Sequence, residues 1–144
     1  MRFWDPSALV PVIVGEPTAA AVHSLLEADP RVAVAWHSEV ECASAVARLE
    51  RTRVIAAAAA DECYRRLDAL RSEWTPTEPT ESVRRGAVRL LRLHDLRAAD
   101  ALQLASAIAA AEGHPASLEF VSLDDRLVAA ARLEGFPVVV PQAG

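Results

Sequence analysis

The chain has 144 residues, of which 52% are hydrophobic and 24% are charged. This length suits one domain with a single core, and the hydrophobic content excludes a disordered chain. The formal net charge of -5 gives no general attraction to nucleic acid, so a polyanionic substrate would need local arginines or a metal ion. All 15 basic residues are arginine, which excludes mechanisms that need a catalytic lysine.

No apolar run has the length of a membrane span, and the first residues lack the basic and apolar regions of a signal peptide. Cys42 and Cys63 form no CxxC pair, and we expect both to be buried thiols in a reducing compartment. The sequence therefore predicts a cytoplasmic protein without a membrane segment, folded as one domain over residues 1–144.

The chain opens with a short apolar run that ends at Asp5 and changes character at Pro6. Proline suits the first position of a helix and aspartate suits the N-cap before it. The pattern predicts a strand that ends at Asp5, followed by a helix over 7–14 that ends at Gly15. Asp5 has two interpretations: a simple cap, or a side chain at the carboxyl edge of a sheet, where open α/β folds bind ligands.

The rest of the chain alternates between helical and strand-like patterns. Helical spacing predicts a helix from residue 19 that ends before Asp29, a helix from Ser38 that segment 54–70 continues, and helices over 81–93, 97–111 and 126–134. Strands are expected at 31–36, 118–123 and 137–140, and a surface loop at 74–79. The alternation indicates a three-layer α/β/α domain around a central, mainly parallel sheet.

Two further acids stand near strand ends, and each has a structural alternative. Asp124 follows an apolar strand as Asp5 does, so it is either an N-cap or a site residue. Asp125 is the other possible cap of the same helix. Capping needs only one acid, so Asp124 and Asp125 together provide one more than the cap uses. Glu41 lies in the first turn of a helix after a strand, where the alternative is an S-x-x-E capping box with Ser38.

Asp100 lies in a strongly apolar helix, where an unpaired carboxylate costs free energy. Its alternatives are an ion pair with Arg97 or a position so near the helix start that it stays solvated. Acids gathered at one sheet edge repel one another unless a cation binds, and an all-oxygen site suits Mg²⁺ or Mn²⁺. Such ions commonly organise phosphate chemistry. Ser7, two residues after Asp5, is expected as a supporting hydrogen-bond donor.

Four segments together resemble a PIN-domain ribonuclease, specifically the VapC-type toxin of a VapBC toxin–antitoxin pair. Residues 3–10 carry a hydrophobic–Asp–x–Ser–Ala–Leu motif, and residues 40–48 form a Glu helix with a trailing Arg. Residues 96–105 carry an Asp-Ala-Leu-x-x-Ala motif, with Gln103 where many members have His. Residues 120–127 carry the last acidic motif.

The resemblance implies a PIN fold and a Mg²⁺- or Mn²⁺-dependent endoribonuclease that a cognate VapB-type antitoxin inhibits. Carried over by position, the acidic pocket and its metal ligands would be Asp5, Glu41, Asp100 and Asp124, with Asp125 nearby. Arg48 and neighbouring arginines would hold RNA phosphates or contact the partner. The paired helices over 38–70 would offer a surface for a homodimer or for the antitoxin.

Two other functions compete with this interpretation. One is a PIN-like domain that has lost activity and only binds a partner, against which the complete set of four acids argues. The other is a phosphoaspartate receiver or phosphatase, which also places aspartates at strand ends. Those proteins depend on a lysine, and this chain has none.

Overall fold

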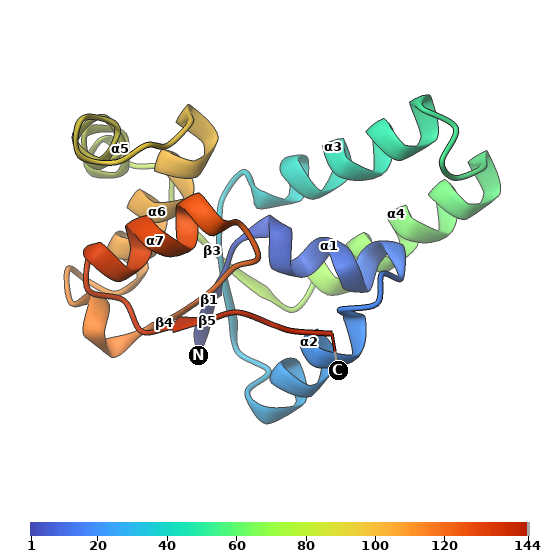
Figure 1. Cartoon of the computed structure of the whole chain (residues 1–144), viewed down its shortest axis with the longest axis horizontal. Helices are drawn as coiled ribbons and strands as arrows, with labels where there is room; N and C mark the ends of the chain where they lie inside the picture. Colours follow the sequence, from blue (N-terminus) through green and yellow to red (C-terminus); the bar gives the residue numbers. More distant parts are fainter. Residues whose placement is uncertain (144) are drawn as a thin grey trace.

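The structure, a computed structural model, describes residues 1–143. Its elements are shown in Figure 1 and occur in the order β1 (Arg2–Trp4), α1 (Pro6–Val14), α2 (Ala19–Ala28), β2 (Val32–Ala35), α3 (Ser38–Arg51), α4 (Ala57–Arg71), β3 (Trp74–Thr77), α5 (Glu81–Leu93), α6 (Ala98–Ala110), the 3₁₀ turn η1 (Pro115–Ser117), β4 (Glu119–Val121), α7 (Asp125–Leu133) and β5 (Val138–Val139).

The five strands form one sheet in the order β3-β2-β1-β4-β5, and each neighbouring pair is parallel. The first strand of the chain is therefore the central one, with Phe3 opposite Ala33 on one side and Phe120 on the other. Because all strands point the same way, the segments that follow β1, β2 and β4 leave the sheet at the same edge.

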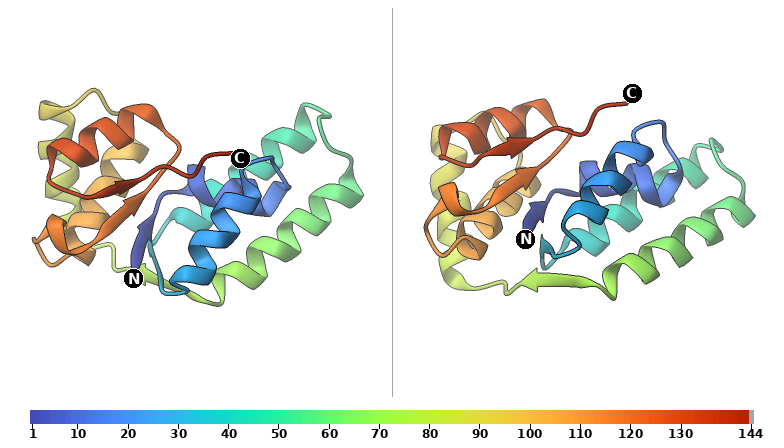
Figure 2. Two further views of the ribbon diagram at one scale, coloured as in Figure 1. Left: turned by 60° about the horizontal axis from the view of Figure 1, so that its bottom comes forward. Right: turned by 90° about the horizontal axis from the view of Figure 1, so that it is seen from below.

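Helices cover both faces of the sheet, which confirms the predicted three-layer α/β/α fold (Figures 1 and 2). Alternation along β1 sends Phe3 into the core under α5, α6 and α7, and Trp4 into the core under α1 to α4. Both side chains are fully buried. Cys42 and Cys63 are free and buried in the second core, as predicted.

The sequence placed most helices within a residue or two. The paired helices expected over 38–70 are α3 and α4, but residues 52–56 separate them, so the expected continuation of the helix from residue 54 begins only at Ala57. Arg53 adopts φ 58° there, and the backbone N–H of Thr52 and of Val54 bond back to the last turn of α3. The break contains no glycine or proline, so the usual signal for the end of a helix is missing. The resulting hairpin projects from the body (Figure 1).

The surface loop expected at 74–79 is also wrong, because Trp74–Thr77 forms strand β3. It pairs with β2 along its whole length, from Trp74 opposite Val32 to Thr77 opposite Ala35. The strand contains Pro76, which has no N–H to donate to a ladder. An edge position tolerates this residue since one side of the strand has no neighbour.

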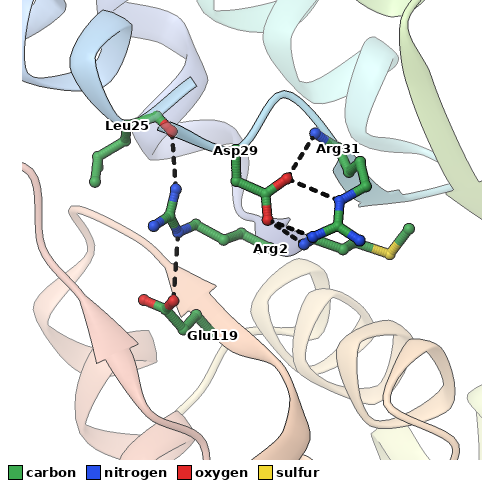
Figure 3. A network of polar contacts seen from close by, with 6 residues as sticks. Arg2, Leu25, Asp29, Arg31 and Glu119 are labelled. Atoms are coloured by element: carbon green, nitrogen blue, oxygen red, sulfur yellow. Dashed lines mark hydrogen bonds and ion pairs between the residues drawn. The ribbon is translucent and has the colours of Figure 1, made fainter. Parts of the chain in front are cut away.

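Polar contacts tie together the amino-terminal edge of the sheet, opposite the edge at which Asp5 lies (Figure 3). Arg2 Nη1 donates to the carbonyl of Leu25 at 2.8 Å, and Arg2 Nε lies 3.6 Å from Glu119. Asp29 accepts from the Arg31 side chain and from the terminal amine of Met1. The Arg31 hydrogen bonds hold the pKa of Asp29 well below its usual range. These contacts join β1 to α2 and β4.

The helices are short, and the longest, α4, has 15 residues. Within residues 1–143 no single helix is long and apolar enough to cross a bilayer, and α1 with α2 reaches that length and composition only as a pair bent by 113°.

Candidate functional site

Asp5 lies where β1 ends and α1 begins, and the residue is 5% exposed. It caps α1 by accepting from the backbone N–H of Ser7 at 3.2 Å. The same oxygen, Oδ2, also accepts from the hydroxyls of Ser7 and, at 3.1 Å, of Ser122. Burial raises the pKa of Asp5 to about 6, although these hydrogen bonds lower it; the charge of Glu41 adds a smaller upward contribution.

The two serines connect the turn after β1 with the turn after β4. Ser7 Oγ accepts from the backbone N–H of Leu123 at 2.9 Å, and Ser122 Oγ accepts from that of Asp124 at 3.0 Å. Ser7 is the supporting donor that the sequence predicted. Ser122 was not anticipated, and its position directly after β4, as Asp5 follows β1, was the available signal.

Asp124 caps α7, which confirms the N-cap that the sequence allowed for it. Its Oδ1 accepts from the backbone N–H groups of Arg126 at 3.0 Å and Leu127 at 3.1 Å. Asp125 is the first residue of α7 and is exposed. The cap occupies one carboxylate oxygen of Asp124 and does not use Asp125 at all.

Asp100 lies in the first turn of α6, and its Oδ2 accepts from the backbone N–H of Arg97 at 3.3 Å. The ion pair with the Arg97 side chain, one of its alternatives, is absent from the described residues. Burial raises the pKa of Asp100, and the nearby charges of Asp124 and Glu41 raise it further. Asp100 is therefore within electrostatic reach of both acids.

Glu41 is not part of a capping box, because the N-cap of α3 is His37 and no side chain caps the helix. Its Oε1 instead accepts from Gln103 Nε2 at 2.8 Å and lies 3.0 Å from His37 Nε2. Gln103 is fully buried and also donates to Ser38 Oγ at 3.1 Å. The sequence identified Gln103 only as a departure from the family motif and assigned no role to His37.

A common pattern links the four acids. Among residues 1–143, every hydrogen bond or ion pair to each of these carboxylates falls on one of its two oxygens. The engaged atoms are Oδ2 of Asp5, Oε1 of Glu41, Oδ2 of Asp100 and Oδ1 of Asp124. The protein thus orients each carboxylate through one oxygen, and the other oxygen has no hydrogen-bond or ion-pair partner among these residues.

A cavity of about 530 Å³ lies beside Asp100, Asp124 and Asp125. Arg97 and Arg126 also line it and are exposed. The cavity therefore combines carboxylates, which attract a cation, with guanidinium groups, which bind phosphate.

Arg48, expected to hold phosphates or a partner, is exposed in the last turn of α3. It lies on the same face as Glu41 but two turns away, roughly 10 Å along the axis. It does not line the cavity. Arg97 and Arg126, which do line it, were not singled out as phosphate ligands from the sequence.

The donor set fits a hard cation such as Mg²⁺ or Mn²⁺, because every available atom is a carboxylate oxygen. Within the described residues no three His, Cys, Asp or Glu side chains are close enough to form a ready-made metal site. Mg²⁺ commonly binds through one or two carboxylates together with water and substrate phosphate, so it needs no such cage.

Comparison with known proteins gives one match. A family model described as PIN domain covers residues 3–133, and PIN domains form a nuclease superfamily. Searches of curated proteins and of solved structures each found no significant match. The matched span contains all four carboxylates and both serines that hold Asp5. The chain belongs to the PIN domain family.

Proposed function

We propose that this chain is a metal-dependent endoribonuclease that serves as the VapC-type toxin of a type II toxin–antitoxin pair. The observation that carries the nuclease proposal is the set of four carboxylates, each with one anchored and one available oxygen, in a domain from a nuclease superfamily. The toxin assignment rests on the resemblance of the four ordered motifs to VapC proteins. The cytoplasm is the compartment in which such a toxin would meet its RNA.

In this proposal Asp5 and Asp100 hold the ion, with Glu41 and Asp124 completing the pocket. Bound Mg²⁺ or Mn²⁺ supplies a Lewis acid that neutralises the phosphodiester charge and lowers the pKa of water. The chain itself orients the substrate, because Arg97 and Arg126 lie beside the carboxylates and can bind phosphate oxygens.

The first test measures cleavage of a mixed-sequence RNA by the purified chain in EDTA, Mg²⁺, Mn²⁺ or Ca²⁺. We expect cleavage in Mg²⁺ or Mn²⁺ and none in EDTA. Ca²⁺ is the control for simple charge neutralisation, because its larger, looser coordination supports phosphate chemistry poorly. Equal cleavage in EDTA would contradict the metal site. RNA binding without cleavage under any ion would favour the inactive binding module.

Gln103 is expected to support Glu41 through its hydrogen bond. Replacing Gln103 with Leu removes the donor and should weaken Mn²⁺ binding about 10- to 100-fold, the usual effect of losing a residue that orients a metal ligand. Calorimetric titration with Mn²⁺ measures this directly. Gln103→Glu keeps the size of the side chain but adds a charge that repels Glu41, so its Mn²⁺ affinity should be no higher than that of Gln103→Leu. Unchanged Mn²⁺ affinity in both variants would contradict the supporting role of the Gln103 hydrogen bond.

The antitoxin and the homodimer are proposed to use the hairpin of α3 and α4. The hairpin projects from the body (Figure 1) and carries a groove of about 480 Å³ whose lining includes Tyr64 and Leu67. Light scattering of the chain alone, and after co-expression with a small upstream reading frame, gives the oligomeric state. A monomer that co-purifies with no product of that frame would contradict both contacts.

A further inference from the structure

Trp36 stands out among the tryptophans because its side chain is 62% exposed. Trp4 is fully buried, and Trp74 is partly buried on the edge strand β3. An exposed indole of this size is informative, since tryptophan usually packs into a core or an interface. Val40, in the first turn of α3, is another exposed hydrophobic residue on this segment, at 68%.

The fold brings Trp36 to the acidic site. It directly follows β2 and directly precedes His37, whose Nε2 lies 3.0 Å from Glu41. β2 is the neighbour of β1, so Trp36 leaves the sheet at the same edge as Asp5. The exposed indole is thus attached to a residue that contacts one of the four carboxylates.

One cation, Arg126, lies on the other side of Asp5 in the strand order. The strand order places β1 between β2 and β4, so Trp36 follows one neighbour of β1 and Arg126 lies just after the other. Two strand spacings, about 10 Å, separate these neighbours. In strand order Asp5 therefore lies between the exposed aromatic ring of Trp36 and the guanidinium group of Arg126, which lines the cavity together with Arg97.

We propose that Trp36 stacks on an unpaired base of the RNA, next to the phosphodiester that the carboxylates address. The inference rests on the proposed function, of which it names a substrate subsite. Single-stranded RNA binds proteins through cationic groups along its backbone and through aromatic rings against its bases, and this edge of the sheet offers both. Stacking tolerates any base, so Trp36 sets where the strand lies and not which sequence is cut.

The main experiment measures KM and kcat for a series of oligoribonucleotides in which one nucleotide at a time lacks its base. Trp36→Ala should raise KM for the intact oligonucleotide about 5- to 150-fold and leave kcat nearly unchanged. For the wild type, one abasic position should produce a comparable rise in KM. At that position Trp36→Ala should add no further loss, because the stacking partner is already gone. Trp36→Phe should restore most of the affinity.

Val88→Ala is the matched control, because Val88 is 57% exposed and lies in α5, outside the α3–α4 hairpin and outside the lining of the cavity. It should leave KM unchanged. The proposal would be overturned if the rise in KM caused by Trp36→Ala added to the rise caused by the missing base at every abasic position. An unchanged KM in Trp36→Ala would also overturn it, as would a fall in kcat alone, which would show that the turn merely supports Glu41.

A second measurement does not depend on cleavage. Without metal, RNA should quench the tryptophan fluorescence of the wild type, and Trp36→Phe should remove that quenching. Binding that is quenched through Trp36 but never followed by cleavage would reject the nuclease activity and retain the stacking site. If RNA quenches the fluorescence of Trp36→Phe as strongly as that of the wild type, the stacking site is rejected. The stacking site is also rejected if Trp36→Ala loses an oligomer but binds RNA with unchanged affinity.

Discussion

Asp5→Asn and Asp100→Asn should each lower metal-dependent RNA cleavage at least about 100-fold. Asparagine keeps the size of the side chain and an oxygen that can accept the existing hydrogen bonds from Ser7, Ser122 or Arg97. It removes the negative charge that would hold the cation. The expected loss is therefore in metal binding and chemistry, with the fold preserved.

Single-turnover cleavage at saturating Mg²⁺, together with Mn²⁺ titration of each variant, measures this loss. Glu39→Gln is the matched control, because Glu39 lies in the same turn of α3 as Glu41 but is 51% exposed and pairs with Arg71 at 3.2 Å. It should cleave at the wild-type rate. Undiminished cleavage by both aspartate variants would refute the assignment of these residues to the metal site.

The second large effect is on stability, because Asp5 is charged at neutral pH despite its burial. Its pKa is raised from 3.8 to about 6 in the folded chain. At a pH between these two pKa values, the Asp5 carboxyl group is therefore protonated in the folded state and ionised in the unfolded state. The associated stabilisation is present below pH 4 and is lost as the pH rises through about 6. The shift corresponds to about 3 kcal/mol.

Asp5→Asn should consequently be more stable than the wild type by up to about 3 kcal/mol above pH 6, and the difference should vanish near pH 4. Urea unfolding of both proteins without metal, at intervals from pH 4 to 7.5, measures the difference. Comparing the two proteins cancels groups that titrate in the opposite direction, such as Glu134, whose pKa is lowered by its hydrogen bonds to Arg89 and His94.

Mg²⁺ supplies the control for this stability effect. At pH 7 it should stabilise the wild type, because a bound cation offsets the cost of the buried charge, and stabilise Asp5→Asn far less. A stability difference that stays constant from pH 4 to 7.5 would show that Asp5 titrates normally and that its burial carries no electrostatic cost.

Local patterns were enough to find the acids. Asp5 and Asp124 each follow an apolar run and begin a helix, and both cap that helix in the structure. Parallel strands share one carboxyl edge, so the same pattern also predicted that these residues would meet. The caps and the site are compatible, since a cap engages one oxygen of a carboxylate and leaves the second.

The partners of the acids could not be found in this way. Gln103 reaches Glu41 from 62 residues away, and Ser122 reaches Asp5 from 117 residues away. Neither pairing follows from helical or strand periodicity, which concerns neighbours within a few residues. The same limitation hid β3, whose short proline-containing segment becomes a strand because β2 offers it an edge.

The sequence by itself determined the alternating α/β fold, the positions of the four carboxylates and the ordered motifs that resemble the PIN family. The fold, the carboxylate positions and the motifs depend on local propensity and on the order of elements, and both can be read directly from the sequence. The tertiary structure alone decided that Asp5 is buried with a raised pKa, that Glu41 accepts from Gln103 instead of forming a capping box with Ser38, and that Trp36 is left exposed. Burial and pairing depend on which distant side chains pack together, so they exist only once the layers have assembled.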